Sequence, residues 1–165
     1  MKNEQKYTRT SSRAASCSPA FMVASWLAVG IMAAVIFYMS AHTGNELDTS
    51  SGIITLVREW LAQAVLVLFG RPADISPIGH FCEYFLLGLA LANALRLHLP
   101  LRSSCVCALM FASAYGITDE IHQIFVPQRS CDPLDWVVDT IAAGLACLIL
   151  YAVMHRKQSK HDNNL

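Results

Sequence analysis

The chain has 165 residues, of which 55% are hydrophobic and only 15% are charged. A soluble domain usually carries about 25% charged residues, so this composition argues against a soluble globular protein. The 12 Lys and Arg residues balance the 12 Asp and Glu residues. Such a balance leaves no basic surface of the kind that nucleic-acid-binding proteins carry, and we expect no nucleic-acid partner. The length predicts a single domain.

Four apolar segments approach the length of about 20 residues that a helix needs to cross a bilayer. They cover residues 21–39, 80–97, 105–125 and 134–154. The first exceeds the apolar core of roughly 7–15 residues of a signal peptide, so we expect an uncleaved span. The sequence therefore predicts an all-α fold, a polytopic membrane helical bundle with four transmembrane helices. Polar tails at 1–18 and 156–165 flank a transmembrane domain at 19–155.

A shorter apolar segment at 53–69 lies in the polar connection between the first two spans. Arg58 and Glu59 interrupt it, and Arg71 and Pro72 end it. An arginine buried at the centre of a span would cost about 2.5–3.5 kcal/mol, whereas an interfacial or re-entrant helix keeps both charges hydrated. We therefore expect an interfacial or re-entrant helix here.

The distribution of basic residues predicts the orientation of the bundle. Four spans place both termini on one side, and that side then carries nine of the 12 Lys and Arg residues, in the two tails and the turn at 96–102. Only Arg58, Arg71 and Arg129 fall on the other side. Because basic residues concentrate in short cytoplasmic segments, we expect both termini in the cytoplasm.

Polar residues gather where the second span begins, the third ends and the fourth begins. Helical periodicity puts 80, 83, 84 and 87 on one face, 115, 119, 122 and 123 on another, and 135, 139, 142 and 146 on a third. Four-span topology brings these ends to the same membrane face, the extracytoplasmic one. The polar cluster so predicted consists of His80, Glu83, Asp119, Glu120, His122, Gln123, Arg129, Asp135 and Asp139. Lipid penalises such groups, so we expect them to face the bundle interior or a hydrated cavity.

A structural role and a binding role both stay open for this cluster. Arg129 would pair with Glu120 or Asp135 in the first case, Asp135 would cap the fourth span, and Asp139 would make a packing hydrogen bond. In the second case, five carboxylates against one arginine and two histidines leave surplus negative charge, which a proton, a cation or a cationic ligand would stabilise. We interpret Ser40 and Ser130 as ordinary loop-edge serines and Trp136 as an interfacial anchor.

The chemistry that the cluster offers is of two kinds. His80, Glu83, Asp119, His122, Asp135 and Asp139 supply the nitrogen and oxygen ligands that zinc or manganese accepts, so a divalent metal is one candidate cofactor. General acid–base chemistry by paired carboxylates fits the same residues. The sequence contains no GxSxG motif and no Gly-rich phosphate loop.

The cysteines at 17, 82, 105, 107, 131 and 147 lack the spacing of a zinc motif. Most of them lie in apolar segments, where cysteine packs as a small hydrophobic residue. Cys82 and Cys131 fall on the predicted outer face, where an oxidising compartment would permit a disulfide. The spacing leaves open whether they pair.

Specific motifs resemble those of the VanZ-like family of bacterial membrane proteins. They are YGITDEIHQIFVPQRS at 115–130, DWVVD at 135–139, HFCEYFLLG at 80–88 and FYMS at 37–40. The resemblance covers about residues 21–154 and assigns the polar cluster, with Tyr84, to the motif positions. Gln128 and Ala142 depart from the pattern, because each replaces a glycine that the family usually has.

The resemblance implies an integral protein of the bacterial inner (cytoplasmic) membrane, in a family whose name-giving member is linked to teicoplanin resistance. We expect the cluster to bind or act on a lipid or lipid-linked cell-wall component, contributing to antibiotic tolerance. Two alternatives are a non-enzymatic accessory protein whose charged cluster stabilises the bundle and a metal-dependent membrane enzyme. The expected partners are membrane lipids and a lipid-linked envelope ligand, and further copies of the chain would form an oligomer.

Overall fold

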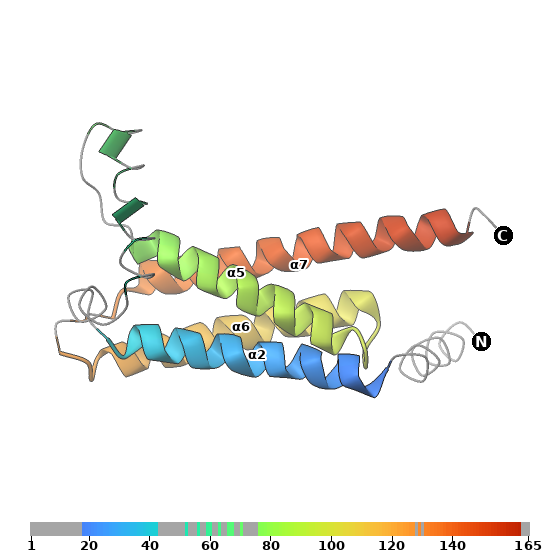
Figure 1. The fold of residues 1–165 in the computed structure, drawn as a ribbon, viewed down its shortest axis with the longest axis horizontal. Helices are drawn as coiled ribbons and strands as arrows, with labels where there is room; N and C mark the ends of the chain where they lie inside the picture. The colour runs from blue at the N-terminus through green and yellow to red at the C-terminus, as the bar shows by residue number, and fades with distance from the viewer. Residues whose placement is uncertain are drawn as a thin grey trace.

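The computed structural model describes residues 18–42, 76–127, 129 and 131–162, together with eight separate positions between 52 and 70. These residues form four long helices: α2 (Pro19–Ser40), α5 (Ser76–Leu95), α6 (Leu101–Gln123) and α7 (Pro133–Asp162) (Figure 1). All four are long and apolar enough to cross a membrane. The predicted four-span helical bundle is therefore confirmed.

The helix expected at 53–69 lies largely outside the described residues, Arg58 among them. Its six described positions, 56, 59, 60, 63, 66 and 67, are helical. The amide of Gly70 then donates to the carbonyl of Leu66 at 2.8 Å, and Gly70 has a φ of 67°. A glycine in this left-handed conformation commonly ends a helix.

Every observed helix begins before its predicted span, whereas α5 and α6 end two residues earlier than predicted. Proline stands at the start of α2, where its missing N–H costs no hydrogen bond. The α6 helix begins at Leu101 instead of 105, and Ser104 donates to the carbonyl of Leu101 at 2.8 Å. At the other end of the chain, α7 continues to Asp162, through residues that the sequence placed in a polar tail. Polar residues adopt helix readily where the helix leaves the lipid, so hydropathy alone underestimates these lengths.

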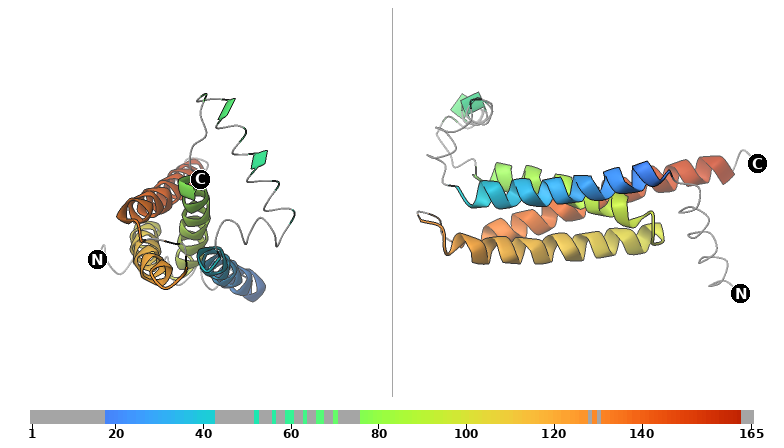
Figure 2. Two further views of the ribbon diagram at one scale, coloured as in Figure 1. Left: turned by 90° about the vertical axis from the view of Figure 1, so that its left-hand side faces the viewer. Right: turned by 60° about the horizontal axis from the view of Figure 1, so that its bottom comes forward.

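Small residues allow α5 and α7 to approach closely. A Cβ atom on Gly88 would lie only 2.8 Å from Cα of Ala143, and Ala92, Ala142 and Ala146 are fully buried. Membrane helices commonly associate through such small residues, because backbones in close contact gain van der Waals energy. The α6 helix packs on both α5 and α7, whereas α2 lies at the edge of the bundle, mainly against α5 (Figure 2).

The helices alternate in direction, and this brings four helix termini together. The end of α2, the start of α5, the end of α6 and the start of α7 lie at one end of the bundle, which we call the polar end (Figure 1). The start of α2 and the end of α7 lie at the other end. There, the indole N–H of Trp26 donates to Nε2 of His98 at 3.3 Å. This arrangement confirms the predicted convergence of the polar segments.

Candidate functional site

The polar end of the bundle contains a group of buried ionisable side chains. His80 is 7% exposed, Asp119 5%, Glu120 4%, Gln123 2% and Asp139 0%. The other members of the polar cluster, Glu83, His122, Arg129 and Asp135, are half-buried. All nine residues that the sequence predicted thus face the protein interior at least in part, as the cost of exposing charge to lipid requires.

The imidazole of His80 on α5 lies between two aspartates of α7. Its Nδ1 shares a hydrogen bond of 3.2 Å with Oδ1 of Asp139, and its Nε2 lies 3.8 Å from Oδ2 of Asp135. The two aspartates are four residues apart and therefore share a face of α7. One histidine thus faces two carboxylates, and the pair of contacts fixes the position of its ring.

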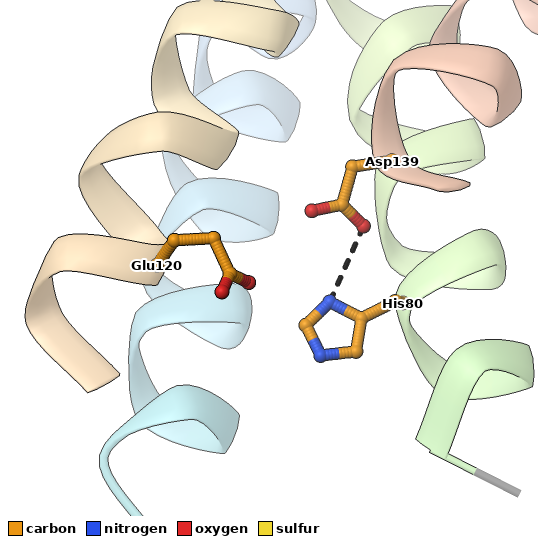
Figure 3. Close-up of side chains that lie close together, drawn as sticks. All are labelled: His80, Glu120 and Asp139. Carbon is orange, nitrogen blue, oxygen red and sulfur yellow. Dashed lines mark hydrogen bonds and ion pairs between the residues drawn. The ribbon is translucent and has the colours of Figure 1, made fainter. Parts of the chain in front are cut away.

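Glu120 approaches the same place from α6. Figure 3 shows its carboxylate directed across the bundle interior toward His80 and Asp139. One potential ligand atom from each of these three residues lies within 4.8 Å of the other two. We call this group the His80–Glu120–Asp139 triad. It combines side chains from three different helices, so it exists only in the folded bundle.

Residues of the loop before α7 contact the carboxylate of Glu120. The backbone N–H of Asp132 donates to Oε2 of Glu120 at 2.7 Å, and the thiol of Cys131 lies beside the same carboxylate. Desolvation and the neighbouring Glu120 raise the pKa of the Cys131 thiol. Cys82 and Cys131 are both exposed free thiols in the structure. Cys131 therefore contacts a member of the triad and forms no disulfide with Cys82.

Several buried polar atoms at the polar end have no hydrogen-bond partner among the described residues. They are Oγ of Ser40, the hydroxyl of Tyr84, Oε1 of Glu120, Nδ1 of His122, Nε of Arg129 and Oδ2 of Asp139. Most buried polar groups in proteins are paired, because an unpaired one costs about 1–3 kcal/mol. Two of the six atoms are carboxylate oxygens of the triad, which makes the triad a candidate place for a bound group.

Gly116 makes room for the Asp139 carboxylate. A Cβ atom at this position would lie 3.2 Å from Cδ1 of Trp136 and 3.4 Å from Oδ2 of Asp139. Trp136 is itself tied to α6, since its indole N–H donates to the carbonyl of Ser113 at 3.1 Å. The indole therefore fixes α7 against α6 beside the triad, and the interfacial-anchor role of Trp136 stays a prediction.

Arg129 has a different partner from the one that the structural reading of the sequence suggested. Its Nη2 donates to the carbonyls of Met39 at 3.1 Å and of His42 at 2.9 Å. The arginine therefore ties the loop to the end of α2, whose last carbonyls have no partner within the helix. The hydrogen bonds of its guanidinium thus go to backbone carbonyls, and Arg129 forms no ion pair with Glu120 among the described residues.

The inward face of α6 differs from the predicted one. Its buried residues include Ala112, Gly116, Asp119, Glu120 and Gln123, whereas the sequence placed 115, 119, 122 and 123 on the face. Tyr115 and His122 instead point toward α2: the Tyr115 hydroxyl donates to the carbonyl of Ala33 at 2.7 Å, and the His122 ring lies 4.6 Å from that of Phe37. Periodicity fixes a helical face only to within about one residue. A shift of the inward face by one residue is enough to bring Glu120 into the interior.

Ser40 and Tyr84 are two residues of the site whose importance was missed or understated. Both are buried, at 4% and 0% exposure, and each has an unpaired hydroxyl oxygen. Tyr84 lies one turn below His80 on the same face of α5, so helical spacing was a usable signal. Ser40 ends α2 and the FYMS motif at 37–40, but helical spacing gave no signal for it, because only the packing of α2 on the bundle buries it.

The sequence matches the VanZ/LLP1 family over residues 25–155. The chain belongs to the VanZ/LLP1 family. No curated protein and no solved structure matches it. Family membership and the four apolar helices together establish a multi-pass membrane protein of the VanZ type.

The matched region of this VanZ/LLP1 protein includes the whole polar cluster. Of the two departures from the motif, Ala142 is fully buried on α7, three residues beyond Asp139, where the close packing tolerates a methyl group. Gln128 lies outside the described residues. The triad thus sits in a site whose framework is that of the family.

Proposed function

We propose that this VanZ/LLP1 protein binds a lipid or lipid-linked cell-wall component at the extracytoplasmic face of the bacterial inner membrane, through the polar end of the bundle. The observation that supports the proposal is the pair of buried, unpaired carboxylate oxygens on Glu120 and Asp139. A bundle that only needed to be stable would pair these atoms or replace them with apolar groups, because either change removes a desolvation penalty.

The chemistry of the ligand head group follows from the charge of the site. Glu120, Asp139 and Asp135 surround a single imidazole, so the site favours a positively charged group or a donor of hydrogen bonds. An amine-bearing head group fits this requirement directly. The unpaired hydroxyls of Tyr84 and Ser40 add neutral hydrogen-bonding groups.

The orientation of the bundle supports an extracytoplasmic site. Arg96, Arg102, Arg156 and Lys157 all lie toward the end opposite the triad, in the turn before α6 and the last part of α7. Basic residues near the ends of spans favour the cytoplasm. The polar end then opens toward the outer leaflet, where lipid-linked cell-wall components are assembled into the envelope and glycopeptide antibiotics act.

A protection assay in cells tests this function. Cells that produce the wild-type protein are expected to tolerate a glycopeptide or lipopeptide antibiotic better than cells without it. Glu120→Ala and Asp135→Ala, at unchanged levels in the membrane, should abolish the protection, because each removes a carboxylate of the site. Thr118→Ala is the matched control: this residue is exposed on the same helix, and its hydroxyl donates only to the carbonyl of Tyr115 at 2.7 Å. Unaltered protection with the two carboxylate variants would contradict the proposal.

A further inference from the structure

The triad has the composition of a metal site as well as the position of a binding site. One nitrogen of His80, one oxygen of Glu120 and one oxygen of Asp139 all lie within 4.8 Å of one another, and all three residues are buried. We propose that His80, Glu120 and Asp139 bind one divalent metal ion of the zinc or manganese type. This inference deepens the proposed function, on whose site it rests.

Two unpaired oxygens already point into the proposed site. Oε1 of Glu120 and Oδ2 of Asp139 are buried and have no partner among the described residues, and Figure 3 shows both carboxylates turned toward His80. No lysine or arginine in the described part of the chain forms an ion pair with either of them. Two carboxylates and a single imidazole leave a negative charge in a poorly solvated place, and a bound cation compensates it.

The donor set selects the class of metal. Imidazole nitrogen and carboxylate oxygen together suit zinc and manganese, and the absence of sulfur among the three ligands argues against a copper(I) or structural Cys-type zinc site. Calcium prefers six to eight oxygen ligands, whereas the triad offers two carboxylates and one imidazole. Three protein ligands leave a coordination position open, which is typical of metal sites that bind a further ligand.

The distances between the ligand atoms of the triad are close to those of a metal-bound site. In a tetrahedral zinc site the ligand atoms lie roughly 3.3 Å apart, as bond lengths of about 2.0–2.1 Å require. Nδ1 of His80 and Oδ1 of Asp139 are already 3.2 Å apart. The ligand atom of Glu120 lies within 4.8 Å of the other two, so it has to move by at most about 1.5 Å, which rotation of its side-chain torsion angles supplies.

Surrounding groups hold the three ligands in place. Asp135 lies 3.8 Å from Nε2 of His80, the N–H of Asp132 donates to Oε2 of Glu120, and Gly116 leaves space beside Oδ2 of Asp139. Metal ligands are usually oriented by such outer contacts. An open position on the metal would then be available to a neutral oxygen atom of the ligand's head group.

Elemental analysis of the full-length protein tests the site. Protein purified in mild detergent without chelator is expected to contain about one zinc or manganese ion per chain. After removal of metal with EDTA, Zn²⁺ titrated back should raise the thermal unfolding temperature, because an ion that binds only the folded state stabilises it. Protein without metal that also shows no shift with Zn²⁺ or Mn²⁺ would overturn the proposal.

The Zn²⁺ affinities of three variants test whether the triad residues are the metal ligands. Glu120→Gln and Asp139→Asn each remove a ligand and should weaken Zn²⁺ binding by more than about 100-fold, since even outer contacts are worth roughly 10- to 100-fold. Glu59→Gln is the matched control, because Glu59 is an exposed carboxylate that lies outside the polar cluster. It should keep the wild-type affinity. An equal loss in all three variants would overturn the assignment of the ligands.

Protein purified in mild detergent without chelator, analysed for both metal and bound lipid, distinguishes the metal site from the proposed function. Metal-free protein that still carries a lipid-linked ligand overturns the metal site and leaves the proposed function intact. Metal-loaded protein that binds no lipid-linked ligand supports the metal site and contradicts the proposed function. Variants that do not fold are recognised by loss of helical circular dichroism. In that case the metal site is tested by the change in the unfolding temperature of the wild-type protein on addition of Zn²⁺.

Discussion

His80 on α5 and Asp139 on α7 meet in the interior of the bundle through a hydrogen bond of 3.2 Å between Nδ1 and Oδ1. Both residues are buried, and Asp139 is fully so. The bond joins two helices that also pack most closely through Gly88 and Ala143. The contact that shapes the candidate site therefore also contributes to the packing of the fold, and the two roles need separate measurements.

The His80–Asp139 pair is expected to show strong energetic coupling. His80→Gln or Asp139→Asn alone should lower the free energy of unfolding by about 3–5 kcal/mol, because each leaves a buried polar partner uncompensated. The double variant should lose less than the sum of the single losses. Chemical or thermal unfolding in detergent with EDTA present measures this coupling without a contribution from metal. Additive losses would show that the two side chains do not interact.

Two glycine variants test the helix packing. Gly88→Ala should destabilise the bundle by about 1–3 kcal/mol, because its Cβ would lie 2.8 Å from the Ala143 backbone and the helices would have to separate. Gly30→Ala is the control, since no atom lies within 4 Å of its Cβ position. It should be neutral or stabilising, as alanine is the better helix former. Equal unfolding temperatures for the two variants would contradict the observed approach of α5 and α7.

Arg129 is expected to act mainly as a clamp on α2. Arg129→Gln should destabilise the protein by about 1.5–3 kcal/mol, because it removes the charged hydrogen bonds to the carbonyls of Met39 and His42. Arg129→Lys should lose less, since an ammonium group still donates to one carbonyl. Amide hydrogen exchange should increase at the end of α2 and stay unchanged at the start of α7. Increased exchange in α7 alone would refute this role.

Cysteine labelling tests the orientation of the bundle. Cys131 is exposed in the loop at the polar end, so a membrane-impermeant maleimide should label it in intact spheroplasts. The comparison is Ser159→Cys in a variant without other cysteines, because Ser159 is an exposed residue near the end of α7. It should react only after the membrane is permeabilised. Labelling should be carried out at mildly alkaline pH, because the raised pKa of Cys131 lowers its thiolate fraction at neutral pH. The reverse labelling pattern would place the triad in the cytoplasm.

Sequence periodicity was sufficient to locate the elements that carry the site. Apolar length identified the four spans, and their alternation required the ends near His80, Gln123 and Asp135 to meet. The stripe of α7 through Asp139, Ala142 and Ala146 is buried as expected, because small residues and one carboxylate on a single face have no other favourable location in lipid.

The partners of individual side chains could not be predicted in the same way. The structural interpretation of the cluster had Arg129 pair with Glu120 or Asp135. Its guanidinium donates to backbone carbonyls at the end of α2, which no sequence pattern indicates. Glu120 and His122 differ by two positions, and only the rotation of α6 in the bundle decides which of them joins the triad. Ser40 joins the site because α2 packs on the bundle and buries its side chain.

The most direct test of the account is native mass spectrometry of the protein released from its own membrane. The wild-type protein is expected to retain a lipid or lipid-linked envelope component, identified by its mass after dissociation. Glu120→Gln, compared at equal folded fraction, should lose that ligand, whereas Thr118→Ala should keep it. If wild type and Glu120→Gln carry the same lipids in the same amounts, the triad is not the binding site, and the central claim is contradicted.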